Sequence, residues 1–111
     1  MKIDTQSHND ISVLTLQGEF TAEAIKSFQD AVSNVLASKT AGLVVDMSKV
    51  MSMDSHTLEC LLDLNDSCRE NVRQLKLAGL DETCRKILEI TRLLKEFDVY
   101  DDVAEAVKSF A

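Results

Sequence analysis

Residues 42–62 have the sequence GLVVDMSKVMSMDSHTLECLL, which joins two patterns typical of different secondary structures. The first part, residues 42–48, is a short and nearly continuous apolar run, as in a strand buried on both faces of a parallel sheet. From residue 55 to residue 72 apolar residues return at helical spacing. The stretch therefore predicts a strand at 42–48, a brief further strand or a turn at 49–53, and then a helix with Asp54 or Ser55 as its N-cap. The apolar face of that helix comprises Leu58, Leu61, Leu62, Asn65, Cys68 and Val72.

The segments on both sides of this stretch continue the alternation. Before it, we expect a short strand at 2–5, a turn at 7–10, a strand at 11–18 and a helix at 21–38 capped by Thr21. After it, we expect a strand at 74–79, a helix capped by Asp81, a short strand at 97–100 and a last helix beginning at Asp101. This order predicts an α/β fold: a mostly parallel sheet with an N-terminal antiparallel hairpin and about four helices.

Length, charge and hydrophobicity limit the classes of protein to which this chain can belong. A chain of 111 residues is expected to form a single domain, residues 1–111. Its formal net charge of -7 repels phosphate backbones, which argues against nucleic-acid binding and suits a partner with a basic patch. The polar N-terminus lacks the apolar core of a signal peptide, and no window approaches the roughly 18 apolar residues of a membrane span. We therefore expect a cytoplasmic protein with no membrane partner.

The cysteines give no sign of a metal site or a disulfide framework. Cys60, Cys68 and Cys84 are odd in number and form no CxxC pair, so they are expected to be small buried hydrophobes. His56 and His8 lie far apart in the sequence, which argues against a histidine metal site. The sequence thus predicts neither a metal nor a cofactor.

The neighbours Asp54, Ser55 and His56 resemble the residue types of a catalytic triad, but their spacing argues against one. A nucleophilic serine needs a base within about 2.6–3.2 Å and a third group that orients the base. Adjacent helical side chains diverge by about 100°, so Ser55 and His56 point apart. We expect no enzyme activity. The stretch does lie at the carboxyl end of a strand and the start of a helix, where parallel sheets place functional sites and where phosphate is favoured.

Four segments together resemble the STAS domains of bacterial anti-sigma factor antagonists. LVVDMSKVMSMDSHTLECLLDL is similar to the family pattern of an apolar strand, D-L-S, then D-S-S-G-L and a leucine-rich helix. GEF at residues 18–20 resembles G-E-L-D before the first helix. QLKLAGLDETCRKILEITRL resembles a strand and a helix that ends in L-x-x-T-G-L. FDVYDDVAEAV resembles the closing F-x-V-Y-x-x-x-x-E-A.

The resemblance implies a regulatory switch. In this family the unphosphorylated domain binds a serine kinase that acts as an anti-sigma factor, or a related partner. Phosphorylation at the start of the helix releases that partner, and a phosphatase reverses the step. The physical basis is a gain of about -1.5 to -2 charges within a binding surface. The implied partner-binding residues are Asp54, Ser55, His56, Thr57 and Glu59.

Departures from the family pattern leave the switch open to more than one interpretation. His56 occupies the position of the usual acceptor serine, Thr57 replaces the glycine, Thr21 replaces the aspartate of G-E-L-D, and Arg92 replaces the glycine of T-G-L. Ser55 is then the first phosphorylation candidate and Thr57 the second. The alternatives are a scaffold that cannot be phosphorylated and a module for a small ligand, although the sequence has no glycine-rich phosphate loop.

Overall fold

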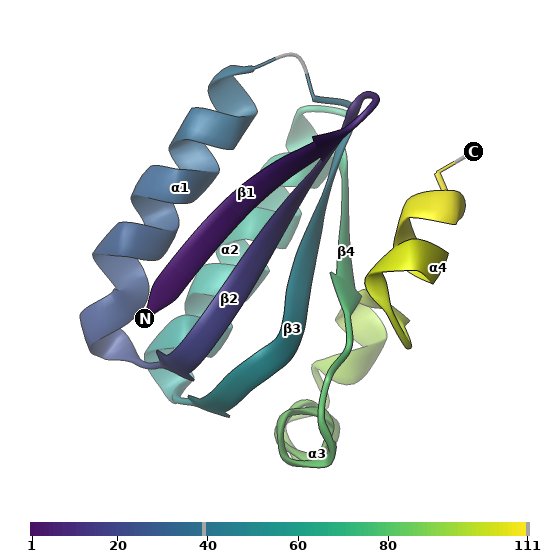
Figure 1. Ribbon diagram of the computed structural model, residues 1–111. Coiled ribbons are helices and arrows are strands. Elements are labelled where there is room, and N and C mark those ends of the chain that lie inside the picture. The colour runs from purple at the N-terminus through teal and green to yellow at the C-terminus, as the bar shows by residue number, and fades with distance from the viewer. Residues whose placement is uncertain (39, 111) are drawn as a thin grey trace.

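The computed structural model describes residues 1–38 and 40–110, which form one twisted sheet with helices on both faces (Figure 1). In chain order the elements are β1 (Lys2–His8), β2 (Ile11–Phe20), the 3₁₀ turn η1 (Ala22–Ala24), α1 (Ile25–Ala37), β3 (Gly42–Met53), α2 (Ser55–Glu70), β4 (Gln74–Ala78), α3 (Glu82–Ile90), the 3₁₀ turn η2 (Leu94–Glu96), β5 (Asp98–Tyr100) and α4 (Val103–Lys108). The predicted order of strands and helices is confirmed.

The sheet has the strand order β1-β2-β3-β4-β5. β1 pairs with β2 antiparallel as a hairpin at the sheet edge, and the other three pairings are parallel. This confirms the predicted mixed sheet with an N-terminal hairpin. Because β2 and β3 run side by side in the same direction, Phe20 and Met53 are partners at their carboxyl ends. The segments that follow these two strands therefore start next to each other.

Two apolar layers cover the sheet. The larger one packs α1, α2 and α3 on one face, around buried strand residues such as Leu14, Val45 and Leu77. In it the rings of Phe20 and Phe28 lie 4.9 Å apart. The smaller layer lies on the other face, where α4 covers a separate cluster of β2, β3 and β4 side chains. The apolar stripes that indicated helices in the sequence are thus the faces that these helices bury.

Lys76 is the main surprise in the packing. Lys76 lies between Leu75 and Leu77 in β4, so its side chain points to the opposite face of the sheet. It is nevertheless buried on that face, beneath α4. Its ammonium group donates to the hydroxyls of Ser109 (2.6 Å) and Tyr100 (3.4 Å) and lies 4.3 Å from the centre of the Phe110 ring. These contacts fasten the C-terminal helix to the sheet.

Several element boundaries differ from those predicted. β1 and β3 are longer, reaching His8 and Met53, because pairing with β2 continues beyond the apolar runs. α2 ends at Glu70 rather than at residue 72, since the chain leaves the helix through Val72 with a φ of 56°. The last helix is capped by Asp102 and not by Asp101: the Asp102 carboxylate accepts the Glu105 N–H at 2.8 Å.

Candidate functional site

The predicted site lies at the junction between β3 and α2, beside the place where β2 leads into α1. Asp54 is the single residue between Met53, the last of β3, and Ser55, the first of α2. The pairing of Phe20 with Met53 brings η1, the turn that leads into α1, against the start of α2. The sequence predicted the junction, but it did not predict that this turn is part of it.

The Asp54 carboxylate holds the starts of two helices. Its Oδ1 accepts the Thr57 N–H at 3.0 Å, and its Oδ2 accepts the Ala22 N–H at 2.8 Å. Asp54, rather than Ser55, is therefore the N-cap of α2, as one of the two predicted options. The prediction that Thr21 caps the first helix is wrong in detail. Thr21 stands at the N-cap position of η1 without a side-chain capping bond, and α1 begins only at Ile25.

The charge of Asp54 is stabilised by these bonds. The Thr57 N–H above all holds the pKa of the Asp54 carboxyl below its usual range. Desolvation opposes this shift, and the Ala22 N–H adds to it. Both oxygens are thus engaged by the backbone, and Asp54 does not need His56 as a partner. This geometry agrees with the conclusion that the three residues are no triad.

Thr57 is the hidden member of the site. Its side chain is fully buried. Its hydroxyl accepts the Asp54 N–H at 3.1 Å and lies within donating distance of two carbonyls, those of Phe20 (3.0 Å) and Asp54 (2.9 Å). With the Asp54 cap this forms a capping box in which threonine takes the place of the usual Glu or Gln. Thr57 therefore connects the end of β2 to the start of α2.

Three predicted site residues face solvent. Ser55, His56 and Glu59 are exposed on the first turns of α2, whereas Asp54 is half-buried. Met51, near the end of β3, leaves 72% of its side chain exposed at the same edge of the sheet. Sequence reasoning missed Met51, and the only signal was its place outside the apolar alternation. The exposed surface at the start of α2 thus combines a hydroxyl, an imidazole and a carboxylate.

Neither a metal site nor a membrane span is found in residues 1–38 and 40–110. No cluster of three or more His, Cys, Asp or Glu side chains in this part of the chain could hold a metal ion. No helix within it is both long and apolar enough to cross a membrane. Cys68 and Cys84 are buried as predicted, but Cys60 is only half-buried, and all three thiols are free.

Comparison with known proteins identifies a family and several relatives. The sequence pattern of the STAS domain family matches residues 2–106. The anti-sigma-F factor antagonist RsfB of Mycobacterium tuberculosis is 26% identical over 95 residues, which cover 75% of this chain and 78% of that protein.

Solved structures share the fold. An anti-sigma factor antagonist from Mycobacterium paratuberculosis superimposes with a TM-score of 0.87 at 21% identity, covering 97% of this chain and 92% of that one. The Bacillus cell fate determinant SpoIIAA in its phosphorylated form has a TM-score of 0.77 at 15% identity, covering 99% and 100%. Because the family pattern spans nearly the whole chain and the fold agrees, this chain belongs to the STAS domain family.

Proposed function

We propose that this chain is a protein-binding partner switch of the anti-sigma factor antagonist kind. The exposed side chains of Ser55, His56 and Glu59, held in place by Asp54 and the buried Thr57, bind a serine kinase or anti-sigma partner, and phosphorylation of Ser55 releases it. A phosphatase restores binding. The main support is the position of Ser55, an exposed hydroxyl at the first residue of α2 in a chain of the STAS family. The curated relative RsfB bears the name of an anti-sigma-F factor antagonist.

The burial of the two hydroxyls favours Ser55 over Thr57. A kinase must reach the oxygen that it phosphorylates, and Ser55 is exposed whereas Thr57 is fully buried. A phosphate on Thr57 would also displace the hydrogen bonds to Asp54 and Phe20. Thr57, the second candidate from the sequence, is better suited to holding Ser55 in place.

A phosphate on Ser55 has both local support and a long-range cost. Locally, the start of a helix favours negative charge by about 0.3–1 kcal/mol. The neighbouring Asp54 carboxylate is already directed at the Thr57 and Ala22 N–H groups, so its charge is partly offset. At the binding surface, about two further negative charges would add to a net charge of -7. A partner whose surface fits the uncharged Ser55 hydroxyl would then lose its contacts there and would have to desolvate the phosphate.

The first test is a pull-down with this chain from cells of its own organism, followed by mass spectrometry. The expected result is a kinase-like or regulatory partner that is retained by the native chain and by Ser55→Ala but lost by Ser55→Asp. Ser7→Asp, which adds the same charge to the exposed face of β1, is the matched control and should retain the partner. Equal binding by all four proteins would refute the switch at Ser55.

The exposed imidazole at position 56 favours one alternative, a scaffold that keeps the fold but has lost the acceptor. His56 occupies the place of the usual acceptor serine. Intact-mass measurement of the chain isolated from its own cells separates the two functions. A species heavier by one phosphate, mapped to Ser55 and absent from Ser55→Ala, would exclude the scaffold. A single unmodified mass under all growth conditions would favour it.

A further inference from the structure

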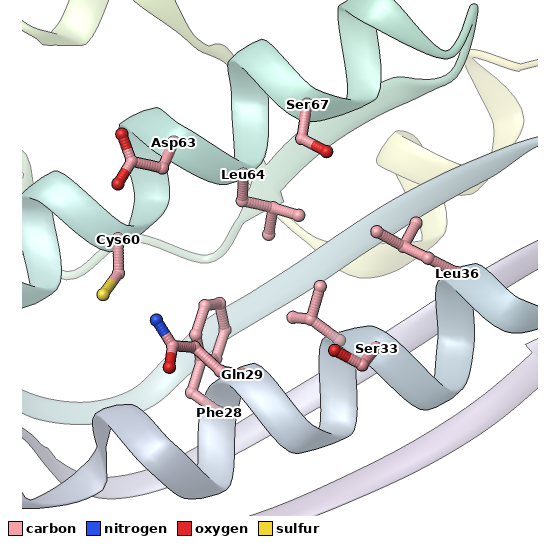
Figure 2. A pocket seen from close by; sticks show the side chains of 9 residues that line it. Phe28, Gln29, Ser33, Leu36, Cys60, Asp63, Leu64 and Ser67 are labelled. Carbon is pink, nitrogen blue, oxygen red and sulfur yellow. The ribbon is translucent and has the colours of Figure 1, made fainter.

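A groove separates α1 and α2 on the outer surface of the helical layer. It has a volume of about 400 Å³. Phe28 and Val32 of α1 and Leu64 of α2, all buried, form its floor. Figure 2 shows Phe28 and Leu64 between the two helices, with Gln29 opposite Cys60 across the opening. The groove is therefore an apolar strip bounded by helices on both sides.

The exposed face of α2 beside this groove is acidic. Along the exposed face of α2, Glu59, Asp63, Asp66 and Glu70 follow one another at intervals of four, three and four residues, which places them in a single row. Asp63 also lines the groove itself. The facing wall, from α1, contributes the neutral side chains of Gln29 and Ser33. An apolar floor beside a row of carboxylates is complementary to a ligand that is apolar on one side and basic on the next.

The groove continues the surface proposed for the switch. Cys60 lies in it and follows His56 by four residues, so His56 occupies the preceding turn on the same face of α2. A partner seated over Ser55 and His56 can therefore extend along α2 into the groove without crossing a ridge.

We propose that the groove between α1 and α2 binds an amphipathic basic helix of a protein partner. Its apolar residues, at i, i+3 and i+4, would pack on Phe28, Val32 and Leu64, and its Lys or Arg residues would face the row from Glu59 to Glu70. Helices pack on one another through their side-chain ridges at about 8–10 Å between axes, and the ridges of α1 and α2 that border the groove can receive a third helix in this way. Nucleic acids and anionic membranes are disfavoured, since they would meet the same carboxylates. The inference rests on the protein-binding role proposed above, but not on phosphorylation of Ser55.

The probe for this groove is a synthetic peptide of about 14 residues with Leu on one helical face and Lys on the other. A second peptide with Glu in place of Lys is its control. Calorimetry with the native, unphosphorylated chain should show binding of the Lys peptide at least about tenfold tighter than that of the Glu peptide, a difference of one decade in Kd. Equal affinities for the two peptides would overturn the charge complementarity.

Cys60 reports where the peptide binds. The thiol of Cys60 is half-buried, whereas those of Cys68 and Cys84 are buried, so a thiol reagent reacts with Cys60 first. Burial, and then the Asp63 carboxylate, raise the pKa of the Cys60 thiol. A lysine that came near without covering the sulfur would therefore speed its reaction. Saturating peptide is expected to slow modification of Cys60 at least about tenfold. Unchanged or faster modification would place the peptide outside the groove.

Two matched variants separate the groove from general acidity. Ser33→Arg and Ser27→Arg each add one positive charge to an exposed site of α1, but only Ser33 lines the groove. The Lys peptide should lose about tenfold or more in affinity for Ser33→Arg and little for Ser27→Arg. Equal losses would overturn the proposal. These measurements need no kinase, so a failure of phosphorylation at Ser55 would leave their outcome readable.

Discussion

At its start, α2 is held by Asp54 and Thr57, which join it to β2 and to η1 through hydrogen bonds of 2.8–3.1 Å. At its end, the chain turns through Val72, whose φ of 56° lies in the left-handed region and whose side chain is 94% exposed. A β-branched residue is a poor choice for that conformation. The comparison shows that side-chain hydrogen bonds fix the start of α2, where the switch is proposed. The far end of the same helix carries backbone strain.

The strain is local, because the hydrogen bonds of the far end are complete. The Val72 N–H donates to the Arg69 carbonyl (3.2 Å) and the Arg73 N–H to the Cys68 carbonyl (2.7 Å), which is a Schellman motif. α3 ends in the same way, with Arg92 at a φ of 62°. Both positions are those that glycine usually occupies, and at Arg92 the family pattern does have glycine. The two ends of α2 thus differ in side-chain choice and not in backbone satisfaction.

The largest expected effect comes from removing the Thr57 hydroxyl. Thr57→Val keeps the shape but leaves the partly buried Asp54 N–H without its acceptor and the Phe20 carbonyl without its donor. At about 1–3 kcal/mol for each unsatisfied group, we expect a loss of about 3 kcal/mol in the free energy of unfolding, measured by urea denaturation. Thr57→Ser retains the hydroxyl and should lose only about 1 kcal/mol for its methyl group. A valine variant as stable as the serine variant would show that the start of α2 is not held by this hydroxyl.

At the other end of α2 the expected change has the opposite sign. Val72→Gly removes a left-handed strain of about 1–2 kcal/mol, reduced by about 0.5–1 kcal/mol for the greater freedom of glycine in the unfolded chain. A net gain of about 1 kcal/mol in urea denaturation is expected. Ile90→Gly is the matched control, since Ile90 is also β-branched and 73% exposed but lies within α3. It should destabilise. If both variants shift stability in the same direction, strain at Val72 is not the cause.

A smaller gain is expected from Arg92→Gly. Arginine is unbranched at Cβ, so it tolerates the left-handed region better than valine, and we expect about 0.5 kcal/mol of stabilisation by the same measurement. The order of the two gains tests the interpretation, because both residues occupy the same position of a Schellman motif. A larger gain at Arg92 than at Val72 would mean that the exposed valine is favoured by something other than backbone geometry.

The contrast between the two ends of α2 also shows what sequence can predict. The apolar run before Asp54 and the helical spacing after it predicted the strand, the helix and the cap, since each depends on neighbouring residues. The bond from Ala22 to Asp54 joins residues 32 positions apart, so no local pattern predicts it. Val72 continued the apolar spacing of α2, and only the Schellman geometry shows that the helix had already ended.

The opposite face of the sheet gives the same lesson. Lys76 alternates with Leu75 and Leu77 along β4, so its side chain points to the opposite face of the sheet. Whether that face is open depends on where α4 lies, and α4 is a short helix that buries Lys76 with Ser109 and Phe110. Periodicity predicts which way a side chain points from its own helix or strand. Whether that side chain is buried depends on a segment that is distant in the sequence.

The smallest effect concerns the pH dependence of the cap, because Asp54 is open to solvent on one side. Its pKa is lowered below 3.8 in the folded state, chiefly by the Thr57 N–H and then by the Ala22 N–H. The folded chain therefore binds this proton less readily than the unfolded chain, so the stabilisation is complete above pH 3.8 and is lost as the pH falls through the lower folded value. Asp54→Asn should remove this part of the acid sensitivity in urea denaturation series between neutral and acid pH.

Ala22→Pro sharpens this last test by removing one of the two N–H groups alone. Thr21 before it is extended, with φ of -122° and ψ of 179°, and proline is well tolerated at the first position of a helical turn. The variant keeps the bond from Thr57 to Asp54, so its acid sensitivity should lie between those of the native chain and Asp54→Asn. Acid sensitivity equal to that of the native chain would show that Asp54 caps α2 only. A value in between would establish that one carboxylate couples the starts of both helices beside Ser55.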